Sequence, residues 1–177
     1  LYHGCIPLNE DGSFREVEIY GRKCKGKALY ECLDSYVRQA FVAIDCEERK
    51  KGRDICWYIW LHENSPLFGK DKMATFERYF LADKETHREK KNPYYSLLEE
   101  EDTARGILRE FGLSEEDGHI INGHVPVKSK NGENPVKCNG KVLVIDGGFS
   151  KAYQKETGIA GYTLIYNSYG LILAAHE

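Results

Sequence analysis

The first half of the chain places its hydrophobic residues at helical spacing. Six of them recur every three or four residues and form one apolar stripe along a predicted helix. They are Leu29, Leu33, Val37, Ala40, Phe41 and Ile44. We expect this stripe to face the core, because a helix with one apolar face gains most of its stability by burying that face.

Two further helices are indicated downstream of this stripe. A polar stretch, Cys46 to Asp54, separates it from an aromatic segment in which Met73, Phe76 and Phe80 again have helical spacing. A highly charged segment follows, and its apolar positions over residues 97–111 predict a helix that ends at a glycine, Gly112. We interpret the charges of this last helix as its solvated face.

After Gly118 the pattern changes to short β-type runs. Four of them have the sequences HIING, KVLVIDGG, GYTLIYN and LILAAHE, and Asn167 to Gly170 supply turn residues between the last two. Helices followed by strands predict a mixed α/β or α+β domain. Because no internal repeat or flexible linker interrupts the chain, we expect residues 1–177 to form a single domain.

Charge and hydropathy exclude two classes of partner. The chain has 25 basic and 28 acidic residues and a net charge of −3, so it lacks the basic field that nucleic-acid or membrane surfaces attract. No apolar stretch approaches the roughly 20 residues that span a bilayer. We therefore expect a soluble protein that binds neither nucleic acid nor membrane.

The two ends of the sequence indicate whether the domain is complete, and the cysteines indicate the cellular compartment. The sequence opens on Leu1-Tyr2-His3 without an initiator Met and stops directly after an apolar run, which suggests an incomplete domain. Six cysteines without a CxxC pair or a secretory context predict a cytoplasmic location. For Cys5 two interpretations stay open: a thiolate ligand or nucleophile, and the one we favour, a small hydrophobic residue packed in a turn.

Two histidines follow apolar runs and are the chemically informative residues. In LYHGCIPL a short hydrophobic start leads His3 onto a glycine-containing turn, and in HIINGHVPV the strand-like run ends at Gly123 and His124. We expect Gly123 to let the backbone bend so that the imidazole turns toward a metal ion. Imidazole suits manganese, iron or zinc when carboxylates complete the coordination.

Read together, these segments resemble a known family. LYHGCIPLNEDG resembles the late histidine motif of the calcineurin-like phosphoesterases, and INGHVPV resembles their final Gly-His motif. The segment SPLFGKDKMATFERYF and the long stretch from Gly123 to Gly170 are similar to the class III fructose-1,6-bisphosphatases in particular. The likeness covers essentially all 177 residues.

The resemblance implies a two-metal hydrolase that cleaves fructose 1,6-bisphosphate to fructose 6-phosphate and phosphate. It implies a layered β-sandwich flanked by helices, with divalent ions, usually manganese, at the strand ends, and His3 and His124 as two ligands of one ion. The bridging Asp, the Asn ligand and the general acid belong to earlier motifs that are absent here. We therefore expect this chain to be the C-terminal part of a catalytic domain and to be inactive alone.

A sugar bisphosphate also requires basic groups or backbone N–H donors. Lys128 and Lys130 follow His124 closely on a loop, and Lys70 and Lys72 lie in another turn, so we name these four lysines as candidates for substrate binding. The N–H groups of Gly147-Gly148 are an alternative phosphate contact.

Two other functions stay open at this point. Another calcineurin-like phosphomonoesterase, a protein phosphatase or a dinucleotide polyphosphatase, would share the metal ligands. A non-catalytic regulatory or oligomerisation module would use the aromatic and charged helices to contact a second chain, and a homo-oligomer is compatible with either reading.

Overall fold

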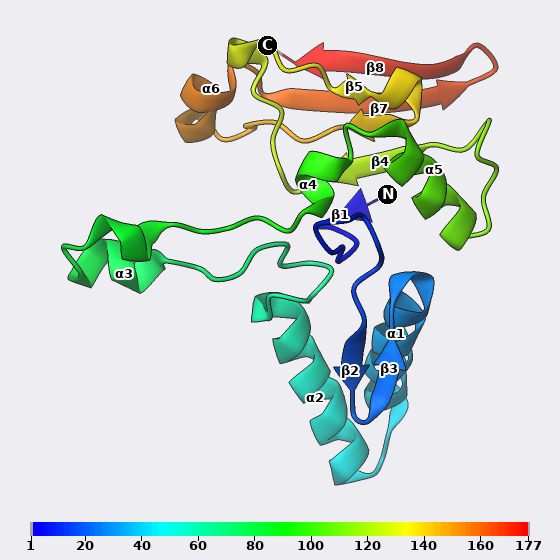
Figure 1. Cartoon of the computed structure of the whole chain (residues 1–177), viewed down its shortest axis with the longest axis vertical. Coiled ribbons are helices and arrows are strands. Elements are labelled where there is room, and N and C mark those ends of the chain that lie inside the picture. Colours follow the sequence, from blue (N-terminus) through cyan, green and yellow to red (C-terminus); the bar gives the residue numbers. More distant parts are fainter. Residues whose placement is uncertain (1, 177) are drawn as a thin grey trace. The chain divides into compact units, whose positions relative to one another are not determined.

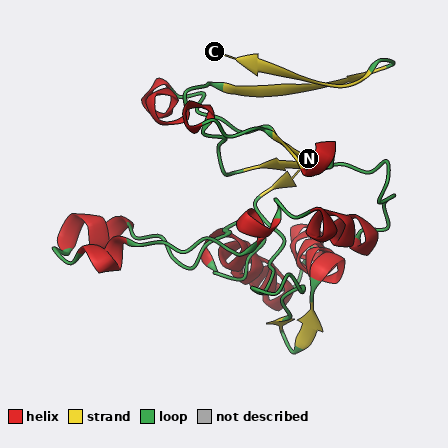
Figure 2. Cartoon of the chain, turned by 45° about the horizontal axis from the view of Figure 1, so that its top comes forward, coloured by secondary structure: helices red, strands yellow, loops and turns green. Residues whose placement is uncertain are grey.

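A computed structural model describes residues 2–176 of the chain, without the side chains of Tyr2 and His3. It divides into two compact units. The sheet unit comprises Leu1–Gly4 and Leu98–Glu177, and the helical unit comprises Cys5–Leu97. Helices and strands occur together, as Figure 2 shows, which confirms the predicted mixed α/β class. No helix among the described residues has the length and apolar character that crossing a membrane requires.

The sheet unit is built on a four-stranded sheet in the order β1-β4-β6-β5. The strands are β1 (Tyr2–His3), β4 (Ile120–Gly123), β6 (Val142–Val144) and β5 (Val136–Lys137). β1, β4 and β6 run parallel, and β5 pairs antiparallel with β6. All three residues of β6 are buried, as expected for a parallel strand covered on both faces.

Helix α5 (Glu101–Glu110) of the sheet unit corresponds to the helix predicted over residues 97–111, but it begins only at Glu101. It buries Ala104, Ile107 and Leu108 on one face. The helix ends before Gly112, whose φ of 71° is the left-handed conformation that glycine adopts at low cost. Hydrophobic spacing and a terminal glycine placed the buried face and the end of this helix, but not its start.

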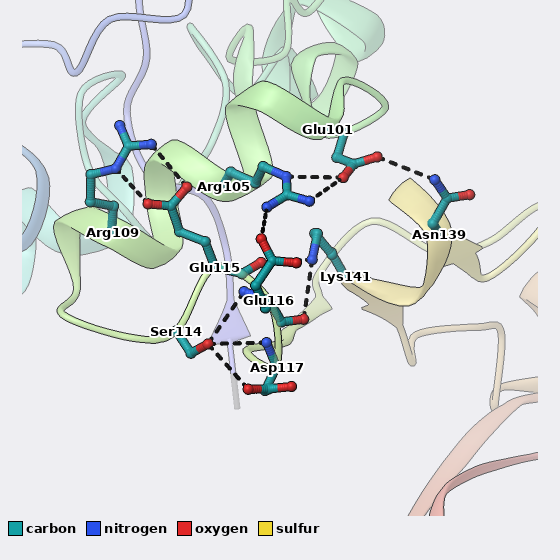
Figure 3. Close-up of polar contacts among 9 residues, drawn as sticks. All are labelled: Glu101, Arg105, Arg109, Ser114, Glu115, Glu116, Asp117, Asn139 and Lys141. Carbon is teal, nitrogen blue, oxygen red and sulfur yellow. Dashed lines mark hydrogen bonds and ion pairs between the residues drawn. The ribbon is translucent and has the colours of Figure 1, made fainter.

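A polar network joins the charged face of α5 to the loop that follows it (Figure 3). Arg105 pairs with Glu101 at 2.8 Å and with Glu116 at 2.7 Å, and Arg109 contacts both carboxylate oxygens of Glu115. Lys141, only 8% exposed, donates to the main-chain oxygen of Glu115 at 2.6 Å. The solvated helix face thus also anchors the loop that leads into β4.

A helix and a hairpin complete the sheet unit. After α6 (Lys151–Thr157), β7 (Gly161–Asn167) and β8 (Gly170–His176) pair antiparallel through the predicted turn. Inside that turn the Asn167 side chain accepts a hydrogen bond from the Tyr169 N–H at 2.9 Å. The predicted hairpin is therefore confirmed.

The helical unit has its core where two helices meet a short hairpin. β2 (Val17–Ile19) pairs with β3 (Arg22–Cys24), and α1 (Gly26–Val42) packs against α2 (Cys46–Leu61). The buried cluster consists of Val17, Ile19, Cys24, Leu29, Cys32, Leu33 and Ile55.

Two sequence predictions for this helix pair were wrong in part. The stripe is buried only at its start, because Phe41 is 90% exposed and Ile44, beyond the end of α1, is 92% exposed. The stretch predicted as a polar separator forms the first turns of α2. Asp45 caps that helix by accepting a hydrogen bond from the Glu48 N–H, a capping signal that outweighs the polar composition.

The arm, residues 70–91, is an excursion of the helical unit. Its two ends lie side by side, because Lys70 and Lys91 form an isolated antiparallel β-bridge. It carries α3 (Thr75–Phe80) and a 3-10 turn, η1 (Lys84–His87), and Figure 1 shows α3 beyond the extended segments of this excursion. The predicted helix exists. Its apolar residues are nevertheless exposed, 73% for Phe76 and 77% for Phe80.

The chain then enters the short helix α4 (Tyr94–Leu97), and Tyr94 is fully buried. The Asn92 side chain accepts hydrogen bonds from the N–H groups of Leu8 and Tyr94, at 3.2 and 3.0 Å. Asn92 thereby joins the segment that follows β1 to the segment that follows the arm.

Candidate functional site

The sheet brings the two predicted metal ligands to the same edge. β1 and β4 are parallel neighbours, and their register pairs His3 with Gly123, the residue directly before His124. Paired residues on neighbouring strands lie about 5 Å apart, so both histidines stand where these two strands end. The His3 side chain itself lies outside the described residues, and its role as a ligand stays a prediction.

The backbone at His124 is unusual. Its φ of 75° places a non-glycine residue in the left-handed region, at a cost on the order of 1–3 kcal/mol. The sequence predicted that Gly123 would supply the bend. Instead Gly123 is the last residue of β4 and His124 itself makes the turn. Such conformations concentrate at functional sites, where the surrounding structure holds them.

Asn122 is a neighbour that the sequence analysis did not single out. It is 2% exposed in the central strand β4, and its Nδ2 donates to the Gly123 oxygen at 2.9 Å. That oxygen belongs to the peptide bond that enters His124, so the hydrogen bond fixes this peptide where the chain leaves the sheet. The sequence did carry a signal for this residue, namely an asparagine inside an apolar strand run. A buried polar side chain needs a hydrogen-bond partner, so its presence there indicates a structural or functional contact.

The donor atoms present fit part of a metal site. Two imidazoles at adjacent strand ends suit a borderline divalent ion, provided that oxygen ligands complete its shell. Among the described residues no group of three His, Cys, Asp or Glu side chains is arranged to hold a metal ion. A metal site at this edge that is shared with other parts of the protein stays a prediction.

Cys5 matches the structural interpretation favoured from the sequence. Its side chain is fully buried, and its Sγ lies 4.0 Å from the Ser65 oxygen. Burial raises the pKa of Cys5 to about 12, so the thiol stays protonated at neutral pH. A protonated thiol is a poor nucleophile and a poor ligand.

The four candidate lysines belong to different units. Lys128 and Lys130 are exposed in the sheet unit, where Lys130 Nζ donates to the Lys155 oxygen at 3.2 Å. In the arm, Lys70 pairs with Glu89 at 2.8 Å, and Lys72 Nζ donates to the Thr86 oxygen at 2.8 Å. The arm lysines thus have structural contacts, and a role of any of the four in substrate binding stays a prediction.

The glycine pair considered as a phosphate contact uses its donors within the chain. The Gly147 N–H donates to the Asp146 carboxylate at 2.9 Å, and the Gly148 N–H donates to the Ile159 oxygen at 3.2 Å. A Cβ on Gly147 would lie 2.4 Å from Gly161. Close packing against β7 therefore accounts for this glycine, which argues against the phosphate interpretation.

Comparisons with known proteins identify the family. The family model described as Firmicute fructose-1,6-bisphosphatase matches residues 1–177. Proteins named fructose-1,6-bisphosphatase class 3 are 64% identical in Clostridium acetobutylicum, 61% in Clostridium botulinum and 59% in Clostridium beijerinckii. Each alignment covers the whole of this chain and 27% of the relative, so the chain spans about a quarter of those proteins' length. No solved structure matches. By its sequence this chain belongs to the Firmicute fructose-1,6-bisphosphatase family.

Proposed function

We propose that the whole protein hydrolyses fructose 1,6-bisphosphate to fructose 6-phosphate and phosphate, with His3 and His124 as ligands of one of two divalent metal ions. Family membership and the names of the relatives support the reaction. The observation that carries the site is the parallel register of β1 and β4, which brings two histidines far apart in sequence to one edge.

This chain's part in the reaction is to hold and orient ligands. When bound, a two-ion centre lowers the pKa of a coordinated water and neutralises phosphoryl oxygens. Each neutral imidazole offers one ring nitrogen to an ion and needs a fixed orientation to do so. The sheet hydrogen bonds fix the backbone at His3, and the Asn122 bond to the Gly123 oxygen fixes the peptide before His124.

The remaining parts of the proposal concern the rest of the protein. The four-stranded sheet would form part of a layered metallophosphoesterase sandwich, whose other strands bring the bridging Asp, the Asn ligand and the general acid. Manganese is the proposed metal and the cytoplasm the proposed location. Because the chain spans 27% of its relatives, we expect these 177 residues alone to lack phosphatase activity.

Exposed lysines would meet the substrate's negative charge. Lys128 and Lys130 share the sheet unit with His124 and follow it within six residues, so they are the preferred pair for phosphate contact. Lys70 and Lys72 are the second choice, because they belong to the helical unit and not to the unit that carries His124.

The test is manganese-dependent phosphate release from fructose 1,6-bisphosphate by the full-length protein and three histidine variants. His3→Ala and His124→Asn should each lose at least about a hundredfold in kcat, because loss of a ligand weakens the metal centre. Asparagine tolerates a positive φ, so His124→Asn keeps the backbone and removes only the imidazole. His176→Ala is the control, since that exposed ring bonds Thr163 on the β7–β8 hairpin.

A second readout separates metal binding from turnover. Titration with Mn²⁺, followed by electron paramagnetic resonance, should show weaker binding in both ligand variants and unchanged binding in His176→Ala. Full activity in either ligand variant would refute the ligand assignment. Faster turnover of phosphopeptides or dinucleoside polyphosphates would assign the protein to another phosphomonoesterase branch, and binding without any turnover would favour the non-catalytic module.

A further inference from the structure

An apolar groove lies between the two helices of the helical unit, and none of the residues assigned to the proposed phosphatase reaction lines it. Its volume is about 550 Å³, and all of its lining residues come from α1 and α2. Cavities of a few hundred to about 1,000 Å³ accept small organic molecules. The groove therefore has the size of a ligand site.

Small residues create this groove. A Cβ placed on Gly52 would lie only 2.0 Å from the Ala40 Cβ, so the helices make their closest approach there with almost no side chain between them. The larger side chains of Val37 and Phe41 line one side, and those of Arg49 and Arg53 line the other. The groove thus has apolar side chains of α1 on one side and basic side chains of α2 on the other.

The charge of the lining is entirely positive. Arg49 and Arg53 line the groove, and no acidic residue does. Arg49 donates through its Nε to the Ala43 oxygen at 2.7 Å, which fixes the guanidinium without neutralising it. Arg53 makes no hydrogen bond or ion pair with the residues that the structure describes.

Nearby acidic groups have other partners. Asp45 accepts the capping hydrogen bond from the Glu48 N–H, and Asp54 lies 3.6 Å from Lys50. Neither guanidinium forms an ion pair with a carboxylate of the described residues, so both are available to an anion in the groove. Arginine favours carboxylate, sulfonate and phosphate groups because its planar fork matches two oxygens at once.

We propose that the α1–α2 groove binds a small organic anion, whose apolar or aromatic body packs on Val37, Ala40 and Phe41 while its acidic group pairs with Arg49 and Arg53. The proposal does not rest on the phosphatase reaction, because none of the groove's lining residues is among those assigned to that reaction. It makes the helical unit a site for an effector or carrier ligand.

The probe for the test is 8-anilinonaphthalene-1-sulfonate, which combines an aromatic body with one sulfonate. Its fluorescence titration with the full chain should show one saturable site. Arg53→Gln should weaken binding about tenfold, the loss expected for one charge-assisted hydrogen bond. The affinity of Arg53→Lys for the probe should lie between those of the unchanged protein and Arg53→Gln. The control Arg22→Gln makes the same change at an exposed position of β3 and should leave binding unchanged.

A second measurement places the probe, because other apolar surface also attracts it. Cys46 and Cys56 line the groove and are exposed, whereas Cys5, Cys24 and Cys32 are buried. Saturating probe should slow alkylation of both groove thiols by iodoacetamide at least threefold, read by mass spectrometry. Unslowed alkylation, unchanged binding in Arg53→Gln, or equally tight binding of uncharged N-phenyl-1-naphthylamine would each overturn the proposal. Circular dichroism of every variant confirms that it is folded.

Discussion

The central strands of the sheet and the α1–α2 helix pair differ in how completely they bury their hydrophobic residues. β6 buries all of its residues, each at most 6% exposed, and β4 buries Ile120 to the same extent. In the helix pair Leu29 is fully buried, while Phe41, on the same predicted stripe, is 90% exposed.

The difference follows from how each element satisfies its backbone. A strand must find a neighbour for its hydrogen bonds, and that neighbour also covers its side chains. A helix satisfies its backbone internally and can extend beyond the elements it packs on. An apolar pattern therefore predicts burial reliably for a central strand, whereas for a helix it predicts only which face will be covered.

The largest effect on stability is expected at the buried end of the α1 stripe, in comparison with its exposed end. Leu29→Ala should lower the free energy of unfolding by about 2–5 kcal/mol, because it opens a cavity in the core. Phe41→Ala should change it by less than about 0.5 kcal/mol, because the ring is exposed. Urea denaturation measures both. Equal losses would mean that Phe41 is covered in solution, which would remove the contrast between helix and strand.

A second test compares two helical glycines. Gly52→Ala should destabilise the protein by about 1–3 kcal/mol, because the new methyl group would overlap Ala40 where α1 and α2 touch. Gly106→Ala should stabilise it by about 0.5–1 kcal/mol, since a Cβ there meets nothing within 4 Å and alanine favours helix. Thermal unfolding of both variants checks the pair, and a stabilised Gly52→Ala would show that the helices are not in close contact.

The sheet can be tested through its buried polar residue. Asn122→Ala should cost about 1–3 kcal/mol, because the side chain is buried and its hydrogen bond to the Gly123 oxygen is lost. Asn64→Ala is the comparison, since Asn64 meets Arg15 at a half-buried position and should cost less. Denaturant titration measures the two losses. If Asn122→Ala is neutral, the turn at His124 does not depend on this bond.

The smallest expected effect is a dependence of the arm's stability on pH. Burial raises the pKa of Glu89, but the hydrogen bonds from Lys70 Nζ and the Ala74 N–H, with the charges of Lys70 and Arg78, hold it below its ordinary value of 4.5. A lowered pKa means that Glu89 stabilises the arm above pH 4.5 and that this contribution is lost as pH falls through the lowered value.

Hydrogen exchange of the Asp71, Ala74 and Asn92 N–H groups, measured between pH 3 and pH 6, reports this loss. After correction for intrinsic exchange, protection should fall toward pH 3. The Glu89→Gln variant should remove the pH dependence, and the same fall in that variant would assign the effect to other carboxylates.

The sequence predicted helices and strands better than it predicted their burial and tertiary contacts. The β4 and β6 strands, the β7–β8 hairpin and the end of α5 just before Gly112 follow from local signals, namely apolar runs, turn residues and a terminal glycine. The exposure of Phe76 and the turn at His124 rather than Gly123 depend on tertiary contacts that spacing does not encode. The β1–β4 register likewise joins segments that no local pattern relates.

The chain order of β1 and β4 also bears on how the protein is made. Strand β1 leaves the ribosome long before β4, because residues 4–119, including the whole helical unit, are synthesised between them. At roughly 5–20 residues per second this interval is on the order of 10 s. The local contacts between α1 and α2 can form within it, whereas the edge that carries both histidines can close only after β4 has emerged. A nascent chain stalled before Ile120 would therefore contain a folded helix pair and a β1 strand that lacks its β4 partner.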